Sequence, residues 1–538
     1  MTQPDFVTRL PHRDDERVFV GRAAGWECFG PVPRNPEELR QLALARTPDP
    51  ARRARALEVL LPVWRRYDLP IAARAALDLA ADPRTHFVLT GQQPGLGGGP
   101  LHLFVKAISV ARLARRLREL GVPTVALFWI ADEDHDVAEL FPGSFDEAGR
   151  DVSLAVPFAA GRTPIAALRL AATERDRWVD WVAGRLPVDA PHRGRLLDLL
   201  AQSFDPAPGV WFRNLLHALL PDEGLLPIHP SDVRPLQGEV LRFDASRPDA
   251  LSQQIAPVVR ELAKRGLPVP IPRVATPPFF WIGDDGGRHR LEVVAGGVRS
   301  KDGSRTFDPD ALDAEVRRNP QRFSPDALLR PLLQDAVLEP FATVVGPTEF
   351  AYHLELAEAY AARAISRPLL IPRLRVRLLD RMARDRLLEL GVSVEAATAP
   401  SLNVAQQLPS ETADRLERDL EAAAQPLLRW AATLGDDPRG TPALQKRLER
   451  LRRRWTEDLD KLARVIERDC AADVSTARKE LERIHAELFP GSEDAERTRS
   501  VFHYLGRYGP GLLGHIAAAF DPFDDRVALL ALERAEGS

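Results

Sequence analysis

Five consecutive acidic or imidazole side chains, Asp132-Glu133-Asp134-His135-Asp136, directly follow the apolar run Leu127–Ala131. Carboxylates at the end of a buried strand can hold an amino group or a hydroxyl, and an imidazole can carry protons near neutral pH. On an extended chain the three aspartates would face one way and Glu133 and His135 the other, which disfavours a shared metal site. We therefore predict substrate binding by Asp132 and Asp136, and catalytic roles for Glu133, Asp134 and His135. The alternative is a solvated acidic loop.

A glycine-rich loop, Gly91–Gly99, lies between a short apolar run and a helix. It lacks the G-x-G-x-x-G dinucleotide pattern and the Gly-Lys-Ser/Thr of a P-loop, so neither a dehydrogenase nor a P-loop kinase is indicated. The helix that follows exposes His102 and Lys106 on one face, where they could meet the phosphates of a nucleotide. The residues predicted to bind nucleotide are Gly91, Gly95, Gly97, Gly98, Gly99 and His102, with Lys106 catalytic and Gln92 and Gln93 binding substrate. The alternative is a tight turn beside a surface lysine.

A second glycine break, Gly346-Pro347-Thr348, separates an apolar run from a helix that begins near Glu349. Glu349 and Tyr352 could reach the same crevice, and we predict that both bind substrate. A glutamate in the first turn of a helix is also a good partner for the helix dipole. In this alternative, Glu349 stabilises the helix and does not bind a ligand.

The elements that must position these residues alternate between strand and helix. A strand from Thr85, a helix over Leu101–Leu120 and a strand over Thr124–Ile130 form a βαβ unit, which predicts adjacent parallel strands. Further strands are predicted at Leu225–His229, Phe341–Val345 and Leu369–Ile371, with helices over Ala172–Arg185 and Asp249–Arg265. Residues 278–307 hold Asp-Asp-Gly-Gly and Gly-Gly turns, which are typical of hairpins. The fold class is α/β, with a Rossmann-like parallel sheet and an inserted β element.

The C-terminal third has a different pattern. Apolar residues from Leu416 to Leu434 recur with the 4-3 spacing of a coiled coil, Gly435–Gly440 makes a turn, and a second series runs from Leu444 to Ile466. A third helical run holds Ala477, Leu481, Ile484 and Leu488. We predict an antiparallel helical hairpin whose seam either joins two copies of the chain or only packs the helices on each other.

Composition narrows the class of protein. The 538 residues are 45% apolar, and 73 basic residues against 77 acidic ones give a net charge of −4, which favours neither nucleic acid nor a membrane surface as partner. The two cysteines, Cys28 and Cys470, are too far apart in sequence to suggest a metal pair or a disulfide framework. The mixed charges of the first twenty residues are unlike a signal peptide, and no apolar run is long enough to span a membrane. We expect a cytoplasmic protein.

Six ordered blocks resemble the BshC family of bacillithiol biosynthesis, described as cysteine ligases. They are GQQPGLGGGPLHLFVK, FWIADEDHD, NPQRFSPDALLRPLLQD, VVGPTEFAYHLEL, PLLIPR and ELFPGSEDAER. The resemblance implies a core related to class I aminoacyl-tRNA synthetases, with connecting insertions and a coiled coil that forms a homodimer. We expect a helical lead-in over 1–84 and a core over 85–375, with insertions at about 145–220 and 278–310 and returning strands at 341–371. A coiled-coil domain over 376–490 is expected to follow. The last expected part is a C-terminal helical segment over 491–538 that packs on the core.

The resemblance also implies a reaction, in which the carboxyl group of L-cysteine forms an amide with the amino group of glucosaminyl-malate. It places the family's motif residues on Gly91, Gln92, Gln93, Gly95, Pro100 and Lys106, on Glu133, Asp134, His135 and Asp136, and on Gly346, Pro347, Glu349 and Tyr352. The chain departs from relatives at Val345-Gly-Pro-Thr-Glu349, where they read Gly-Gly-Pro-Gly-Glu, and at Asp494-Ala-Glu-Arg497, where they read Leu-Gln-Glu-Arg. These departures put the specificity for the acceptor in doubt.

Amide formation in water needs an activated carboxyl group. We therefore expect ATP or another nucleotide, Mg²⁺ only together with that nucleotide, and no other metal, since the sequence offers no paired thiolates for zinc. In this hypothesis the glycine loop, His102 and Lys106 hold the phosphates, while Glu133, Asp134 and His135 hold the acceptor and deprotonate its amine. The alternatives are an amino-acid ligase or adenylyltransferase with another acceptor, and a non-catalytic dimeric nucleotide-binding scaffold.

Overall fold

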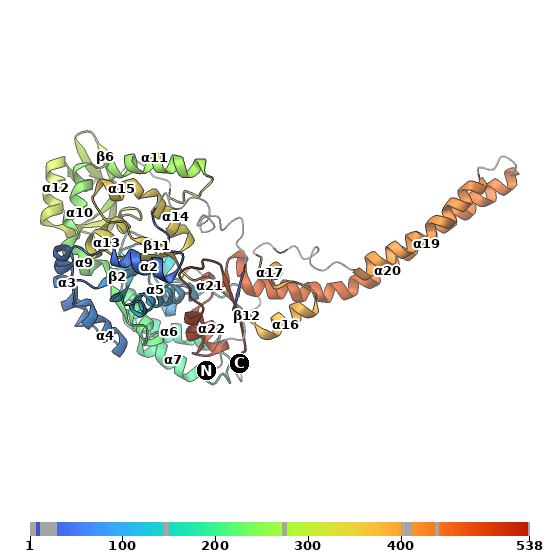
Figure 1. Ribbon diagram of the computed structural model, residues 1–538, viewed down its shortest axis with the longest axis horizontal. Helices are drawn as coiled ribbons and strands as arrows, with labels where there is room; N and C mark the ends of the chain where they lie inside the picture. Colours follow the sequence, from blue (N-terminus) through green and yellow to red (C-terminus); the bar gives the residue numbers. More distant parts are fainter. Residues whose placement is uncertain are drawn as a thin grey trace. The chain divides into compact units, whose positions relative to one another are not determined.

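The computed structural model describes residues 7–10, 30–141, 144, 150–271, 277–399, 402, 411–435 and 441–535. The chain divides into two compact units (Figure 1). Unit 1 comprises Met1–Asp146, Arg150–Leu378 and Ala495–Ser538, and unit 2 comprises Glu147–Gly149 and Leu379–Asp494. Within the described ranges, every helix is too short or too polar to cross a membrane. Cys28 and the predicted turn at 436–440 lie outside the described residues, as does the side chain of Cys470.

Unit 1 is built on a five-stranded parallel sheet in the order β11-β10-β2-β3-β4. The strands are β2 (His86–Gln92), β3 (Thr124–Ile130), β4 (Leu225–Ile228), β10 (Ala342–Val345) and β11 (Leu369–Pro372). The long helix α5 (Leu101–Glu119) connects β2 to β3. These two strands pair in parallel, beginning with His86 of β2 opposite Thr124 of β3. This confirms the predicted α/β class and the parallel βαβ unit.

Both faces of this sheet are buried because its strands are apolar on both sides. Val88, Ala126 and Phe128 pack in one core with α5, whereas Phe87 and Val125 pack in a second core on the other face. This division follows from the alternation of side chains along a strand. The helices that form these layers include α3 (Pro50–Trp64), α4 (Ile71–Ala80), α8 (Pro208–Leu219), α13 (Leu329–Leu338) and α15 (Ala357–Ala362).

The remaining helices of unit 1 connect and flank these layers. They are α2 (Pro36–Leu44), α6 (Ala172–Ala183), α7 (Arg193–Gln202), α9 (Pro230–Val233), α10 (Gly238–Ser246), α11 (Ala250–Lys264), α12 (Pro309–Arg318) and α14 (Pro347–Glu355), with short 3₁₀ turns that include η5 (Val137–Leu140) and η6 (Ile165–Ala167). The predicted helices over Ala172–Arg185 and Asp249–Arg265 correspond to α6 and α11 within two residues.

An antiparallel sheet includes residues 278–307, the stretch in which the turns predicted hairpins. Its order is β8-β7-β6-β5-β9. The strands are β5 (Phe279–Ile282), β6 (Arg288–Val294), β7 (Gly297–Ser300), β8 (Thr306–Phe307) and β9 (Phe323–Pro325). Strand β6 begins with Arg288, immediately after the turn at Gly286-Gly287, and this position brings its guanidinium to the candidate site described below.

The C-terminal segment returns to unit 1. Helices α21 (Ala495–Thr498), α22 (Val501–Tyr508) and α23 (Leu512–Ala518) all contact α5. A strand, β13 (Ala528–Leu532), follows them and pairs antiparallel with β1 (Val7–Arg9) in a three-stranded sheet completed by β12 (Val376–Asp380). The sequence predicted only helix in this segment, so β13 is an addition to it.

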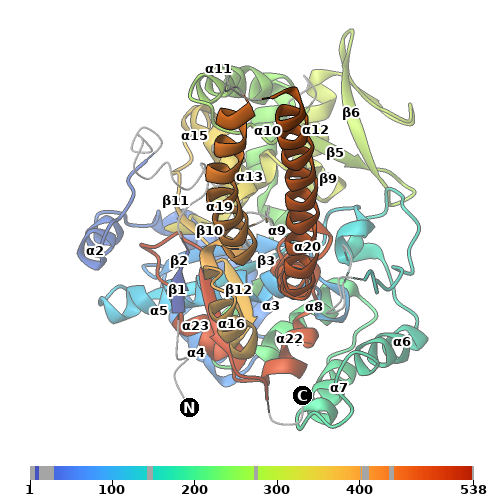
Figure 2. The same cartoon turned by 90° about the vertical axis from the view of Figure 1, so that its right-hand side faces the viewer.

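Unit 2 contains α16 (Arg381–Glu389), α17 (Val394–Ala397) and two long helices, α19 (Glu411–Gly435) and α20 (Pro442–Leu488), which lie side by side (Figure 2). The prediction of a separate third helical run was wrong, because α20 is a single helix of 47 residues. Residues 467–476 contain no proline or glycine, so nothing in this stretch ends the helix.

Candidate active site

The carboxyl ends of the parallel strands bring the predicted polar residues to one edge of the sheet. Gln92 ends β2, Asp132–His135 follow β3, His229 follows β4, and Gly346 follows β10. In open parallel sheets this edge is where ligands bind. The candidate active site is defined by the side chains gathered here.

Lys106 is buried and lies at the centre of one cluster. Its Nζ donates hydrogen bonds to the carbonyl oxygen of Gly91 (2.6 Å), to Oε1 of Gln92 (3.0 Å) and to Oε2 of Glu349 (2.7 Å). The same Oε2 accepts a hydrogen bond from the backbone N–H of Gly346 (2.8 Å), which fixes Glu349 in the first turn of α14. These contacts join β2, α5 and α14.

The cluster leaves Lys106 no spare donor, because an ammonium has three N–H groups and all three are used. Burial lowers the pKa of Lys106, and the carboxylate of Glu349 opposes this effect. Burial also acts to raise the pKa of Glu349, yet Lys106 holds it below its usual value. A buried ion pair of this kind positions its neighbours, and it does not present a free cation to a phosphate.

A chain of hydrogen bonds continues from Lys106 to the acidic segment. Gln92 Nε2 donates to Gln93 Oε1 (3.1 Å), and Gln93 Nε2 donates to Asp134 Oδ2 (3.4 Å). Asp134 Oδ1 accepts in turn from Arg288 (2.8 Å), whose guanidinium also contacts His135 Nδ1 (2.8 Å). The predicted residues at the ends of β2, β3 and β10 therefore form one connected network.

The expected alternation after β3 was wrong. Asp134 and His135 share Arg288 as partner, because the chain turns at Asp132–Glu133 and does not stay extended. Burial acts to raise the pKa of Asp134, but Arg288 and the backbone N–H of His135 bring it below the usual value. Burial and Arg288 lower the pKa of His135. Asp136 is exposed and caps η5 through the N–H of Ala138.

Glu133 is buried and surrounded by arginines. Its Oε2 accepts a long hydrogen bond from Ser324 (3.4 Å), whereas its Oε1 has no hydrogen-bond partner in the part of the chain that the structure describes. Burial raises its pKa, and three guanidinium groups oppose this shift, those of Arg288, Arg234 and Arg330. The Nε atoms of these three arginines are also buried and without a partner. Buried polar atoms without partners are uncommon in folded proteins and can mark a ligand site.

Asp132 forms a separate buried pair with His229, at 2.7 Å between Oδ2 and Nδ1. Sequence reasoning missed this histidine because it placed His229 inside a strand, whereas β4 ends one residue earlier. Asp132–Asp136 were predicted as site residues because they directly follow a strand. The same criterion would have identified His229 if the end of β4 had been placed correctly. Arg288 and Arg330 were also missed, although Arg288 directly follows the Asp-Asp-Gly-Gly turn and Arg330 lies inside the block NPQRFSPDALLRPLLQD.

The remaining predicted residues are buried beside these clusters. The phenol of Tyr352 accepts a hydrogen bond from Arg330 (3.1 Å), and its pKa is raised, mainly by burial. His102 is buried near Arg373 and Arg497, and burial followed by these two charges lowers its pKa well below the usual value. Its Nδ1 has no hydrogen-bond partner.

The glycines of the loop pack against apolar side chains. Gly97 has φ +57°, and a Cβ there would lie 2.6 Å from Trp178. At Gly98 a Cβ would crowd Val501 and Phe502, and at Gly95 and Gly99 it would crowd the other glycine and Leu103. Close packing therefore accounts for these glycines without a bound anion.

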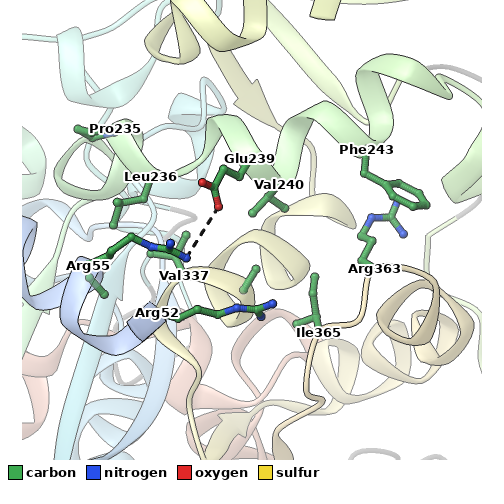
Figure 3. A pocket seen from close by; sticks show the side chains of 12 residues that line it. Arg52, Arg55, Pro235, Leu236, Glu239, Val240, Phe243, Val337, Arg363 and Ile365 are labelled. Carbon is green, nitrogen blue, oxygen red and sulfur yellow. Dashed lines mark ion pairs between the residues drawn. The ribbon is translucent and has the colours of Figure 1, made fainter. Parts of the chain in front are cut away.

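A separate cavity of about 370 Å³ contains none of the predicted residues (Figure 3). It is lined by α3, α10 and α13, with Arg55 and Glu239 4.0 Å apart across it. Of the two other arginines that line it, Arg52 pairs with Asp49 and Glu339, and Arg363 pairs with Asp244 and lies over Phe243. Among the described residues, no three His, Cys, Asp or Glu side chains are arranged to hold a metal ion.

Comparison with known proteins matches two family models to this chain. Residues 27–374 match "Bacillithiol biosynthesis BshC, N-terminal Rossmann-like domain", and residues 382–532 match the "C-terminal coiled-coil domain" of the same family. A protein of Salinibacter ruber named "Putative cysteine ligase BshC" is 28% identical over 89% of both chains. A protein of Geobacillus kaustophilus with the same name is 28% identical over 85% of this chain and 86% of its own length.

Proposed function

Because this chain belongs to the BshC family of bacillithiol biosynthesis, we propose that it is a cysteine ligase. The reaction joins the carboxyl group of L-cysteine to the amino group of glucosaminyl-malate and gives bacillithiol. The match to both family domains, over nearly the whole length of relatives named as cysteine ligases, carries this proposal. The buried carboxylates at the carboxyl edge of the sheet supply the kind of groups that bind an amine.

The carboxyl group of cysteine is activated before the amide forms, as an acyl phosphate or an acyl adenylate. ATP or another nucleotide with Mg²⁺ supplies this activation. Lys106 and the glycine loop fit a phosphate group poorly, since the lysine donors are used and the glycines are packed. Arg234, Arg288 and Arg330 fit it better, because each has a buried Nε without a partner and guanidinium groups bind phosphates well.

Glu133 binds the ammonium group of the acceptor in this proposal. Its unpartnered Oε1 is a buried acceptor, and an ammonium is a strong donor to a carboxylate. Asp134 and His135 act with it by holding Arg288 in place. Gln92, Gln93, Glu349 and Tyr352 bind substrate or support the residues that do.

The test is a reconstituted reaction. The purified full chain is incubated with ATP, Mg²⁺, L-cysteine and glucosaminyl-malate, and bacillithiol is quantified by mass spectrometry. Glu133→Gln is expected to lower kcat/KM by roughly 10²-fold or more, the loss of one charged contact in the transition state. The matched control is Glu223→Gln, which removes a carboxylate paired with Arg112 elsewhere in unit 1. Full activity without nucleotide would contradict the activation step, and a product with another amine only would favour a different acceptor.

We also infer that two copies of the chain associate through α19 and α20. These helices pack on each other, yet Leu427, Trp430, Leu444 and Leu462 are about half exposed. An apolar hollow of about 280 Å³ lies along the same hairpin. Helices that needed only each other would bury these side chains. Trp430→Glu is expected to convert a dimer to a monomer in sedimentation velocity, whereas Leu388→Glu, an exposed leucine on α16, should not.

A further inference from the structure

His229 and Asp132 form a polarised pair. Asp132 Oδ2 lies 2.7 Å from His229 Nδ1. A carboxylate accepts a hydrogen bond, so the neutral imidazole donates through Nδ1–H and keeps its lone pair on Nε2. Both residues are more than nine-tenths buried. Among the described residues, His229 Nε2 and Asp132 Oδ1 have no hydrogen-bond partner, so each is a buried acceptor that a ligand donor would satisfy.

The surrounding chain holds this pair rigidly. The backbone N–H of His229 donates to Asp232 Oδ2 (2.8 Å), the same oxygen that accepts from the hydroxyl of Tyr67 (3.2 Å). The ring of Tyr67 also meets the imidazole edge to face at 6.4 Å. The carbonyl of Asp132 accepts from the N–H of Ala166 (2.7 Å). Two strand ends and three flanking segments therefore fix the orientation of the imidazole.

Gly209 on α8 makes room for the carboxylate. A Cβ at this position would overlap Asp132 Oδ2 and lie 3.2 Å from its Cγ. The glycine is helical and has no unusual φ, so close approach alone explains its presence. The missing side chain at Gly209 therefore leaves room for the carboxylate of Asp132 in its pair with His229.

The other imidazoles near this edge are poorly suited to accept a proton. The Nδ1 of His135 already contacts the guanidinium of Arg288 at 2.8 Å, and burial together with this cation lowers its pKa. His102 is buried near Arg373 and Arg497, which oppose its protonation. His229 instead has a carboxylate on one nitrogen, which stabilises the charge that forms when the other nitrogen accepts a proton.

We propose that His229 is the general base of the ligase and that Asp132 is its positioning residue. The sequence had suggested His135 as one of the residues that deprotonate the amine. This inference rests on the proposed function. The acceptor ammonium gives one proton to His229 Nε2, and the freed lone pair on nitrogen forms the C–N bond with the activated carboxyl carbon of cysteine. The bond from this carbon to the phosphate oxygen breaks, and the phosphate group leaves with the electron pair. The nitrogen passes its second excess proton to an oxygen of the departing phosphate group as the amide forms, and His229 releases its proton to solvent.

Two variants separate this role from a structural one. Asp132→Asn keeps the shape of the side chain, but its amide donates to Nδ1, which moves the imidazole proton to Nε2 and removes the lone pair that must act. His229→Gln removes the base itself. The matched control is His217→Gln, which removes another buried imidazole of unit 1, one whose Nε2 contacts the carbonyl oxygen of Leu225.

Each variant is assayed in two reactions with ATP, Mg²⁺ and cysteine. The first uses glucosaminyl-malate, whose amine must lose a proton before it attacks. The second uses hydroxylamine, which is uncharged near neutral pH and traps an activated carboxyl group without a base. We expect Asp132→Asn to slow bacillithiol formation by roughly 10²- to 10⁴-fold and to leave hydroxamate formation within about twofold of the unsubstituted chain.

The outcomes distinguish the proposal from the function on which it rests. Bacillithiol formation within about threefold of the unsubstituted chain in both variants would overturn the role of His229. An equal loss of both reactions with a normal unfolding transition would also overturn it, because the pair would then serve activation. If the unsubstituted chain forms neither product, the proposed ligase function fails, whatever the variants do.

Discussion

Replacing Lys106 with methionine tests whether this buried lysine holds the site together or binds phosphate. The methionine keeps the length of the side chain and removes the charge. Glu349 then keeps the hydrogen bond from the N–H of Gly346 but loses its ammonium partner, and the carbonyl oxygen of Gly91 loses the same donor. Removing one partner of a buried ion pair typically costs about 3–5 kcal/mol. We expect a loss of stability of this size in unit 1.

The measurement is urea unfolding followed by tryptophan fluorescence, since Trp64, Trp129, Trp178 and Trp211 are all fully buried in unit 1. The double variant Lys106→Met/Glu349→Gln removes both charges and should recover about 2 kcal/mol or more of the loss. A loss below about 1 kcal/mol for Lys106→Met, with a large rise in KM for the nucleotide, would refute the reasoning and favour a phosphate role.

Three further predictions concern other buried positions of unit 1. Burial raises the pKa of Asp335 to about 7, so the folded state retains this proton. The free energy of unfolding therefore falls as the pH rises from about 4 to 7. In urea unfolding, Asp335→Asn should be up to about 4 kcal/mol more stable than the unsubstituted chain at pH 8 and no different from it near pH 4. Gly209→Ala should displace Asp132 and slow bacillithiol formation roughly 10²-fold, and an unchanged rate would contradict the crowding. Gly97→Ala should cost about 1–3 kcal/mol through its clash with Trp178 and leave the nucleotide KM unchanged.

The sheet could be predicted from sequence because its signals are local. The strand predicted at Thr124–Ile130 has the observed bounds, and the helix predicted over Leu101–Leu120 ends one residue later than α5. Glycine and proline flank α5 and precede β3, and an apolar run as short as that of β3 suits a strand buried on both faces. The alternation expected for an extended Asp132–Asp136 segment was wrong because a turn follows Ala131.

The contacts of the site could not be predicted, because their partners are far apart in sequence. Arg288 lies 154 residues from Asp134, and Glu349 lies 243 residues from Lys106. No periodicity relates such positions, so the sequence could place these residues at strand ends or turns without pairing them. The role of His229 was missed for a different reason, an error of one residue in the end of β4.

The pairing of Lys106 with Glu349 also constrains how the protein forms during synthesis. At about 5–20 residues per second, roughly 12–50 s separate the appearance of the two residues. An ammonium cannot be buried unpaired at low cost, so α5 cannot settle into its final place on β2 until α14 has emerged. The site becomes complete only when about two thirds of the chain exists.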